Sequence, residues 1–478
     1  MNRRQRRTTP TASTPGTEAR PRANAPSGVD GAQPDEAARK ASEPDGFADA
    51  LALVGRQAPA VAAQERSRDA APDRSGGLRP MSWASARTLA ARAGLACPPR
   101  TRRVPLEESL GHLLADPLVA MGDLPPFDTS AMDGWAVAGP GPWAIGGGGS
   151  VLAGQSATVP LEDGSAVRIA TGARIPPEAT AVIRTEHART DEGHRLLSTD
   201  RPTSPGQDIR PRGQECRSGD QLLPAASLVT PAVLGMAAAA GYDDLSIVMR
   251  PRAEVLILGD ELLTEGLPHD GLIRDALGPL VGPWLTSLGA EVIGTRLLGD
   301  DADALYQAIT TSEADLILTT GGTAAGPVDH VHPVLQKAGA ELLIDSVAVR
   351  PGHPMLLAAW GLQGSRGRPR HLLGLPGNPL AAVSGLLSLA QPLLRGLIGL
   401  PLPAPYRASI RDPLSGHPYD TRLVPAVHRE GQLVPLRYGG PAMLRGVVAA
   451  DGLVVVPPGG VRSGELVELL DLPWTFGP

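Results

Sequence analysis

The chain has 478 residues, too many for one hydrophobic core, so we expect roughly three or four domains. Its formal net charge of −6 argues against a nucleic-acid-binding protein, which would carry a basic patch or stripe. Its two cysteines, Cys97 and Cys216, belong to no CxxC or Cys/His pattern, which argues against disulfides and zinc and for a reducing compartment. We see no apolar run long enough to span a bilayer and no signal peptide, so we expect a cytoplasmic protein.

The N-terminal part of the chain divides into a polar tail and a helical region. Residues 1–78 are rich in Arg, Pro, Ala, Asp and Ser and have no sustained apolar period. They cannot bury enough surface to offset chain entropy, so we expect this tail to be disordered. SWASARTLAARAGL (82–95) and VPLEESLGHLLADPLVA (104–120) place apolar residues at helical spacing, which predicts two amphipathic helices.

Residues 123–223 have a different pattern, with short apolar runs separated by Gly and Pro, which predicts a compact β domain. LVTPAVLGMAAAAG (228–241) then returns to helical spacing. Because helical segments lie on both sides of the β region, we expect it to be inserted into a discontinuous helical and extended domain made of residues 79–122 and 224–250.

Residues 251–400 alternate predicted strands and helices. The strands, contained in AEVLIL, EVIGTRLL, ADLILTT and HLLGLPG, are almost wholly apolar, which predicts a parallel sheet covered by helices on both faces. Ligands of such sheets bind outside the carboxyl ends of the strands. Three loops follow those ends: GDEL (259–262), GGTAAGPVD (321–329) and LPGNP (375–379). The short strands of residues 401–478 predict a small β domain or barrel.

The glycine loop 321–329 has few side chains, so its backbone could lie close to a phosphate. No Lys or Ser/Thr follows in the P-loop pattern, which excludes a Walker-type nucleotide site. Asp329 has two interpretations, a helix N-cap or a functional acid. Asn378 and Pro379 predict an N-cap and a first helical residue, and the start of that helix could either bind an anion or serve only the fold.

Acidic residues also lie at the predicted carboxyl edge. Glu261 follows one strand, and Asp300 and Asp301 follow the next. Neighbouring carboxylates repel one another unless a cation lies between them, and oxygen ligands of this kind suit Mg²⁺. The alternative is that they are solvated surface acids. In the β region, Asp133 and Thr171 are the polar candidates among loops rich in Gly, Pro, Asp and Thr.

Six motifs occur in a fixed order from about residue 81: PPFDTSAMDGWAV, RIATGARIP, GDEL, TGGTAAGPVDH, RPGHP and LPGNPLAA. Together they resemble the molybdopterin molybdenumtransferase family, the MoeA and gephyrin E-domain group. The resemblance implies a multidomain α/β and β fold: a central parallel α/β domain like that of molybdopterin adenylyltransferase (251–400), the β-rich insertion, the discontinuous domain and a small C-terminal β-barrel domain. It also implies an elongated homodimer whose active site lies between the α/β domain and the neighbouring subunit's β domain.

The family inserts the metal of molybdate into adenylylated molybdopterin and releases AMP, with Mg²⁺. The resemblance implies catalytic roles for Asp133, Thr171, Glu261, Asp329 and Asp301. It implies Mg²⁺ ligation by Glu261, Asp329 and one of Asp300 and Asp301. The substrate-binding positions that it implies are Ser130, Gly321, Gly322, Gly326, Asp275, Arg350, His353, Gly377 and Asn378. Molybdopterin adenylyltransferase and recipient molybdoenzymes are possible partners, whereas neither nucleic acid nor a membrane is expected.

Several side chains depart from the family pattern: Ala324, Pro327, His330, Arg350 and His353. Arg350 and His353 stand where the family has lysines. Two hypotheses therefore stay open, an active molybdenum insertase with a modified pocket and a non-catalytic or altered-role paralogue that binds molybdopterin or nucleotide as a carrier or scaffold. A regulatory nucleotide-binding protein that shares only the α/β domain would leave the motifs within residues 125–186 unexplained.

Overall fold

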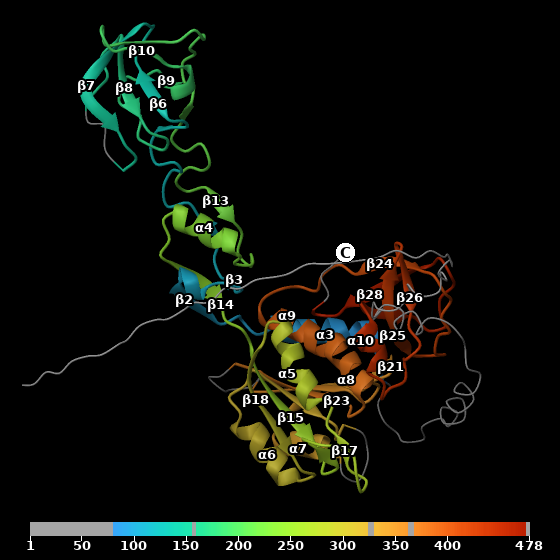
Figure 1. Cartoon of the computed structure of the whole chain (residues 1–478). Helices are drawn as coiled ribbons and strands as arrows, with labels where there is room; N and C mark the ends of the chain where they lie inside the picture. The colour runs from blue at the N-terminus through green and yellow to red at the C-terminus, as the bar shows by residue number, and fades with distance from the viewer. Residues whose placement is uncertain (1–79, 155–158, 324–328, 362–367, 475–478) are drawn as a thin grey trace, which may run out of the picture. The chain divides into compact units, whose positions relative to one another are not determined.

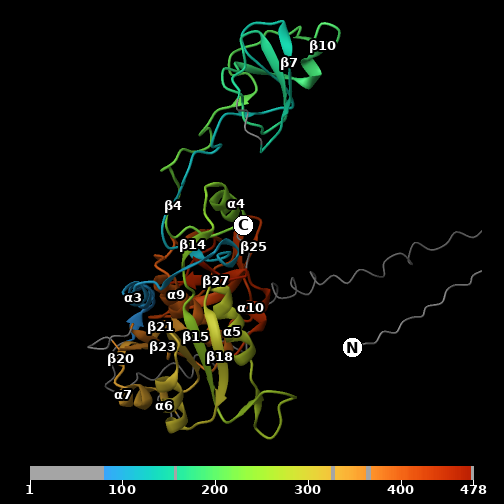
Figure 2. The same ribbon diagram turned by 90° about the vertical axis from the view of Figure 1, so that its left-hand side faces the viewer.

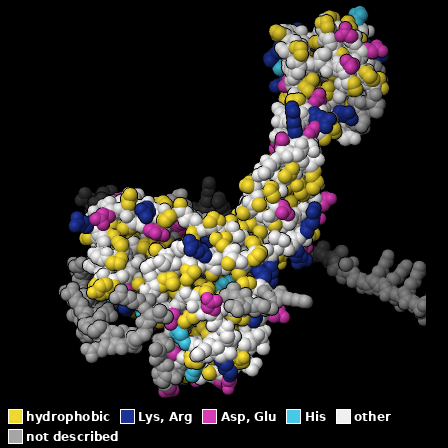
Figure 3. All heavy atoms as spheres, turned by 180° about the vertical axis from the view of Figure 1, so that it is seen from behind, with side chains coloured by type: hydrophobic (Ala, Val, Ile, Leu, Met, Phe, Trp, Pro, Cys, Tyr) yellow, Lys and Arg dark blue, Asp and Glu magenta, His cyan; other side chains and the backbone are white. Residues whose placement is uncertain are grey.

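The computed structural model describes residues 80–154, 159–323, 329–361 and 368–474 (Figures 1 and 2). The predicted fold class is confirmed, because the chain combines a β-rich region, a largely parallel sheet covered by helices and a closed barrel. On the face seen in Figure 3, basic and acidic side chains are interspersed rather than gathered by sign. Cys97 and Cys216 are both buried free thiols.

The first predicted helix is confirmed as α3 (Trp83–Leu95), whose N-terminus is capped by Ser82. Its packing was not predicted, because α3 lies against α9 (Gln391–Leu397) instead of joining residues 104–122. A Cβ on Gly94 would overlap the carbonyl oxygen of Leu393, and one on Gly396 would overlap that of Ala91. The two helices therefore cross with their backbones in contact, which only glycine allows here.

The predicted helix over residues 104–120 is wrong. This segment forms β2 (Thr101–Pro105), a 3-10 turn (Leu106–Glu108), β3 (Leu113–Leu114) and β4 (Leu118–Val119). Pro105 and Pro117 interrupt a helix, and Gly111 adopts a φ of +74°. Leu114 and Leu118 are buried through strand pairing, since β14 (Asp244–Val248) pairs with β2 and β3, and β13 (Gln221–Leu223) pairs with β4, whereas Leu110 is exposed. The predicted helix in 228–241 is confirmed as α4 (Pro231–Ala239).

Residues 123–223 are built from short strands, as predicted. The main sheet has the order β10-β11-β7-β8-β6-β9, and a two-stranded ladder joins β5 to β12. Two apolar clusters lie on this sheet, one around Trp143 and one around Ile169. The strands are β5 (Thr129–Ser130), β6 (Gly134–Val137), β7 (Trp143–Val151), β8 (Ser165–Ile169), β9 (Ala181–Arg184), β10 (Arg189–Asp191), β11 (Leu196–Ser198) and β12 (Ile209–Arg210).

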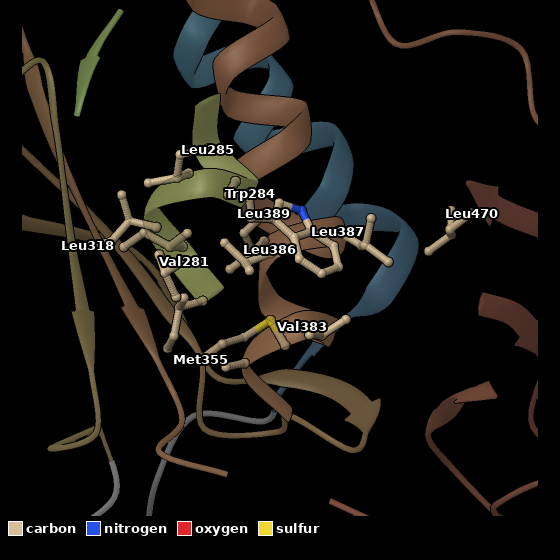
Figure 4. Packing of buried hydrophobic residues seen from close by; sticks show 14 of the residues in the cluster. Val281, Trp284, Leu285, Leu318, Met355, Val383, Leu386, Leu387, Leu389 and Leu470 are labelled. Atoms are coloured by element: carbon tan, nitrogen blue, oxygen red, sulfur yellow. The ribbon is translucent and has the colours of Figure 1, made fainter. Parts of the chain in front are cut away.

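The α/β sheet has the order β18-β15-β19-β23-β22-β20. Its first four strands are parallel, as predicted: β18 (Glu291–Leu298), β15 (Arg252–Leu258), β19 (Leu316–Thr320) and β23 (Arg370–Leu375). The last two were not predicted: β22 (Leu356–Trp360) runs antiparallel to β23, and β20 (Glu341–Asp345) runs antiparallel to β22. One face packs on α6 (Ala302–Thr311) and α7 (Val331–Lys337). The other packs on α5 (Gly278–Ser287) and the helix from Pro379 (Figure 4).

The helix from Pro379 to Leu397 is the centre of the core. It consists of α8 (Pro379–Gly385), a π-helical turn (Leu386–Ala390) and α9. Side chains of α3 bind the π turn, because Arg87 Nη1 donates to the Leu387 carbonyl at 2.6 Å and Trp83 Nε1 donates to Ser388 Oγ at 3.0 Å. Among the described residues this is the one helix long and apolar enough to cross a membrane, with 89% of it buried. The expectation that no such run exists was wrong; the run is a core helix.

The C-terminal strands close into the predicted barrel, because β24 pairs with β26 and β28, and β25 pairs with β26 and β27, which itself pairs with β28. The barrel strands are β24 (Tyr406–Ile410), β25 (Thr421–Arg429), β26 (Gln432–Pro435), β27 (Gly452–Val456) and β28 (Leu466–Asp471). A further strand, β21 (Val347–Arg350), adds to β25 in parallel. Since β21 lies between β20 and β22 in the chain, it joins the barrel to the α/β sheet.

Candidate functional site

The carboxyl ends of the parallel strands are aligned. Ile257 of β15 pairs with Thr320 of β19, and Thr320 pairs with Leu375 of β23. Leu258 pairs with Leu298 of β18 on the other side. The loops that follow these strands therefore begin side by side, as the sequence predicted, and they lie where open α/β sheets bind ligands.

These loops also touch one another through their backbones. The N–H of Gly321 donates to the carbonyl oxygen of Leu375 at 2.8 Å. Gly321 adopts a φ of +81°, and a Cβ there would lie 3.3 Å from the Leu258 carbonyl oxygen. A Cβ on Gly377 would lie 3.7 Å from the Cα of Gly321. The chain that leaves β19 at Gly321 thus lies against the end of β15 and against the loop after β23, with glycine backbone at these contacts.

The RPGHP loop joins this surface. Gly352 adopts a φ of +112°, and a Cβ there would lie 3.0 Å from the carbonyl oxygen of Ala381 in the first turn of α8. The loop is closed by a bond from the N–H of Val347 to the His353 carbonyl at 3.0 Å, and His353 Nδ1 lies 3.1 Å from the Val347 carbonyl. Arg350 Nε donates to Asp420 Oδ2 at 2.8 Å. Gly352, which lies between Arg350 and His353 in the chain, therefore packs on the first turn of the helix that follows Gly377 and Asn378.

The acidic residues differ in what their carboxylates do. Asp301 caps α6, with Oδ1 accepting from the N–H of Asp303 at 2.8 Å and of Ala304 at 3.1 Å. Glu261 is exposed, and its carboxylate folds back over Gly259, where a Cβ would overlap it. Asp260, which the sequence analysis did not select, lies over Gly299 in the same way and so bridges the loops after β15 and β18. The position of Asp260 inside the GDEL motif could have identified it as a candidate from the sequence.

Among the described residues, no three His, Cys, Asp or Glu side chains form a group that could hold a metal ion. The predicted ligands Glu261, Asp300, Asp301 and Asp329 are thus not assembled into a site made of protein alone. Mg²⁺ in enzymes usually has one or two carboxylates, several waters and substrate phosphates around it. The exposed carboxylates at this edge fit that kind of site, in which the substrate completes the coordination.

Asp329 lies one residue before the N-cap position of the helix that follows it. The helix α7 begins at Val331, and His330 occupies the N-cap position. The N-cap position is thus not the one that the helix-cap interpretation of Asp329 assigned. Gly322 is described and, like Gly321, has a positive φ, whereas Ala324, Gly326 and Pro327 lie outside the described residues. The functional interpretation of Asp329 stays a prediction.

Two other predicted binding residues lie at helix starts. Asp275 Oδ1 accepts from the N–H of Leu277 at 2.8 Å and of Gly278 at 3.0 Å, so its carboxylate closes the first turn of α5. Asn378 is the N-cap of α8, as predicted, but its side chain makes no capping hydrogen bond. Asn378 is exposed beside Gly377. The amide of Asn378 is therefore available to a ligand at this edge, whereas the Asp275 carboxylate already has a structural partner.

The remaining predicted residues lie in the β-rich region. Asp133 Oδ1 accepts from the N–H of Thr171 at 2.7 Å and from its hydroxyl at 3.0 Å. The two bonds from Thr171, the backbone bond first, hold the pKa of Asp133 below its ordinary value and keep it a carboxylate. Ser130 is fully buried, and its hydroxyl donates to the Met132 carbonyl at 2.6 Å.

A cavity that the sequence analysis missed lies in the same region. It measures about 400 Å³ and is lined by Leu124, Pro125, Thr129, Arg210, Gln214 and Glu215. Pro125 and Thr129 belong to the PPFDTSAMDGWAV motif, so motif residues contribute to a concave surface as well as to the Asp133–Thr171 pair.

Known protein families match the chain along nearly all of its described length. Residues 81–241 match the MoeA N-terminal region (domain I and II), residues 254–396 a probable molybdopterin binding domain, and residues 407–472 the MoeA C-terminal region (domain IV). Molybdopterin molybdenumtransferase 2 of Mycobacterium tuberculosis is 34% identical over 406 residues, covering 79% of this chain and 96% of its own length. The chain belongs to the molybdopterin molybdenumtransferase family.

Further relatives agree with this assignment. Molybdopterin molybdenumtransferase of Staphylococcus aureus is 29% identical over 387 residues, covering 77% of this chain and 90% of its own. The solved structure of the molybdopterin biosynthesis MoeA protein of Pyrococcus horikoshii has the same fold, with a TM-score of 0.70, 24% identity, and coverage of 82% of this chain and 99% of that one. Membership of the molybdopterin molybdenumtransferase family places the chain among the transferases of molybdenum cofactor biosynthesis.

Proposed function

We propose that this chain inserts the metal of molybdate into adenylylated molybdopterin and releases AMP in the presence of Mg²⁺. The observation that carries the proposal is the meeting of the GDEL, GGT, RPGHP and LPGNP loops at one edge of the sheet. The glycines of these loops allow close backbone contacts, Glu261 of the GDEL loop is exposed, and Arg350 lies two residues before Gly352, which packs on α8. A substrate with a pyrophosphate needs such a combination of close backbone approach and fixed cationic groups.

Each group has a role in this proposal. The loop backbones at Gly321, Gly322 and Gly377 admit the phosphates and the pterin. Arg350 binds an oxyanion, because a guanidinium offers planar N–H donors to phosphate or molybdate oxygens. The exposed Glu261 and the half-buried Asp300 and Asp329 would hold Mg²⁺, which supplies charge neutralisation for pyrophosphate cleavage when it is bound. Asp133 and Thr171 act as a carboxylate and hydroxyl pair on the substrate.

The test is AMP release by the full chain supplied with adenylylated molybdopterin and Mg²⁺. The proposal expects AMP to appear when molybdate is added and the metal to be recovered in the pterin product. Tight retention of the adenylylated pterin without AMP would instead support the alternative, a carrier or scaffold. The family relatives with transferase names favour the enzyme.

We further propose that the working form is a cytoplasmic homodimer in which the Asp133–Thr171 pair of one subunit completes the loop surface of the other. The support is the family resemblance, which implies a homodimer whose site lies between the α/β domain and the neighbouring subunit's β domain. Mixing Asp133→Asn and Asp329→Asn chains tests it, because random pairing makes half of the dimers mixed and each mixed dimer has one intact site. Two inactive variants should then recover about a quarter of wild-type activity. No recovery would place both groups in one subunit.

A further inference from the structure

The strand that carries Arg350, β21, lies in the barrel's sheet, although the strands before and after it in the chain, β20 and β22, lie in the α/β sheet. It leaves the α/β region, pairs in parallel with β25 of the barrel, and matches Val349 to Thr421 and Arg350 to Arg422. Asp420 immediately precedes β25. Its Oδ2 accepts from Arg350 Nε at 2.8 Å. A predicted site residue on β21 is therefore directly bonded to a carboxylate at the start of the neighbouring barrel strand, β25.

Asp420 is a fixed partner. Its side chain is 10% exposed, whereas that of Arg350 is 42% exposed. The turn before β25 is held by His417, whose Nδ1 accepts from the N–H of Asp420 at 3.0 Å and whose carbonyl accepts from the N–H of Gly459 at 3.2 Å. Because the Asp420 carboxylate is largely buried, losing its ion-pair partner would be unfavourable, which favours a persistent ion pair.

The contact through Nε determines how the guanidinium is oriented. A guanidinium is planar and its N–H donors keep fixed directions, so a bond at Nε sets the plane in which the terminal nitrogens lie. A lysine has one flexible ammonium and cannot be oriented in this way. At position 350 a barrel carboxylate thus holds the plane of the arginine side chain.

We infer that Asp420 is a positioning residue, which orients Arg350 for an oxyanion of the substrate and so makes the barrel a determinant of the site's anion affinity. The inference rests on the proposed function for the identity of the anion. Arg350 lies two residues before Gly352, and Gly352 packs on the first turns of α8, the helix that follows the LPGNP loop. The chemical class of the bound group is a phosphate-like or molybdate-like oxyanion.

The first test is equilibrium binding of inorganic pyrophosphate and of molybdate, measured by calorimetry on full-length variants, which needs no turnover. Asp420→Asn keeps the size of the side chain and removes its charge. We expect it to weaken the binding of at least one of the two anions by roughly 5–10-fold, the scale of a charge-assisted hydrogen bond. The control is Asp412→Asn, because Asp412 pairs with Arg411 on the exposed surface of the same barrel. It should bind both anions as the wild type does.

The second test separates positioning from general stability. Arg350→Ala should lose anion affinity and regain part of it when guanidinium ion is added, because the ion can occupy the place beside Asp420. The double variant Arg350→Ala, Asp420→Asn should not be rescued. Where turnover occurs, Asp420→Asn should raise KM more than it lowers kcat.

Three results would overturn the inference. One is unchanged anion binding in Asp420→Asn, whether or not its melting temperature falls. Another is equal rescue by guanidinium with and without Asp420. The third is wild-type protein that binds neither anion. A wild type that binds the anions but releases no AMP contradicts the proposed function alone and leaves the Asp420 result valid.

Discussion

The backbone N–H and the hydroxyl of Thr171 both donate to one carboxylate oxygen of Asp133, at 2.7 and 3.0 Å. Both residues were selected from the sequence on separate motifs about forty positions apart, and β6 and β8 bring the motifs together as neighbouring strands. Two donors on one oxygen favour the ionised acid, so the Asp133 pKa lies below its ordinary value. Asp133 is therefore ionised and would act as a carboxylate rather than as a proton donor.

Replacing Thr171 by Val should raise the pKa of Asp133. The change removes the hydroxyl donor but keeps the backbone N–H, so the pKa should move part of the way back to the ordinary value. The stabilising effect of these bonds is present when Asp133 is ionised and is lost as the pH falls through its folded-state pKa. Carbon-13 NMR titration of the Asp133 carboxyl measures the shift. Thr190→Val, at an exposed position of β10, is the control and should leave the pKa as it is.

Glycine substitutions in two helices should have opposite effects on stability. Gly94→Ala places a Cβ on the Leu393 carbonyl where α3 crosses α9, so it should lower the free energy of unfolding by roughly 1–3 kcal/mol through overpacking. Gly235→Ala in α4 meets nothing within 4 Å and should raise it by about 0.5–1 kcal/mol, the usual gain of alanine in a helix. Urea unfolding compares the two. Equal effects would contradict the backbone contact between α3 and α9.

The stability of the α/β region should fall as the pH falls from about 6.5 to about 4. His371, at 2% exposure, is buried in β23, and this burial lowers its pKa from 6.5 to about 4. Because the folded-state pKa is the lower one, the unfolded chain takes up the proton first, so the stability is complete above pH 6.5 and is lost progressively below it. The loss amounts to about 3 kcal/mol at 1.36 kcal/mol per pKa unit.

The check is urea unfolding followed by tryptophan fluorescence between pH 4 and pH 7.5. His371→Leu removes the titrating group, so its stability should change much less across this range. A wild-type curve with the same slope as the variant would show that His371 is not the group responsible.

Asp300 and Asp301 should separate into a functional and a structural acid. Asp301 caps α6, so Asp301→Ala should lower the free energy of unfolding by roughly 1 kcal/mol, whereas Asp301→Ser keeps a capping oxygen and should restore most of it. Asp300→Asn should leave the stability unchanged and raise the Mg²⁺ concentration needed for half-maximal AMP release. A raised Mg²⁺ requirement in Asp301→Ser would reverse the assignment.

The sequence was most informative where one local pattern determined the structure. Apolar runs of four to eight residues predicted the parallel strands, and the glycine loops after them predicted the ligand edge. The error at residues 104–120 arose because leucines at helical spacing were weighed above Pro105, Gly111 and Pro117. The strand that pairs with β2 and β3, β14, lies more than a hundred residues further along the chain, so no local pattern could reveal this pairing.

Contacts between distant segments of the chain account for other features that the sequence did not predict. The crossing of α3 with α9 and the bond from Arg350 to Asp420 join parts of the chain that have no shared local signal. The capping roles of Asp275 and Asp301 are local, but acids at helix starts and acids at metal sites look alike in a sequence. The positions of the loops after the strands were therefore predictable from the sequence. Which carboxylates make capping hydrogen bonds could be seen only in the structure.

The activity proposed for this chain is the insertion of molybdenum into adenylylated molybdopterin. The most direct measurement is AMP release from adenylylated molybdopterin by the full chain with Mg²⁺, with and without molybdate, alongside the Asp329→Asn variant. The proposed function predicts molybdate-dependent AMP in the wild type and a loss of at least tenfold in the variant. Wild-type protein that binds the adenylylated pterin yet yields no molybdate-dependent AMP would contradict it.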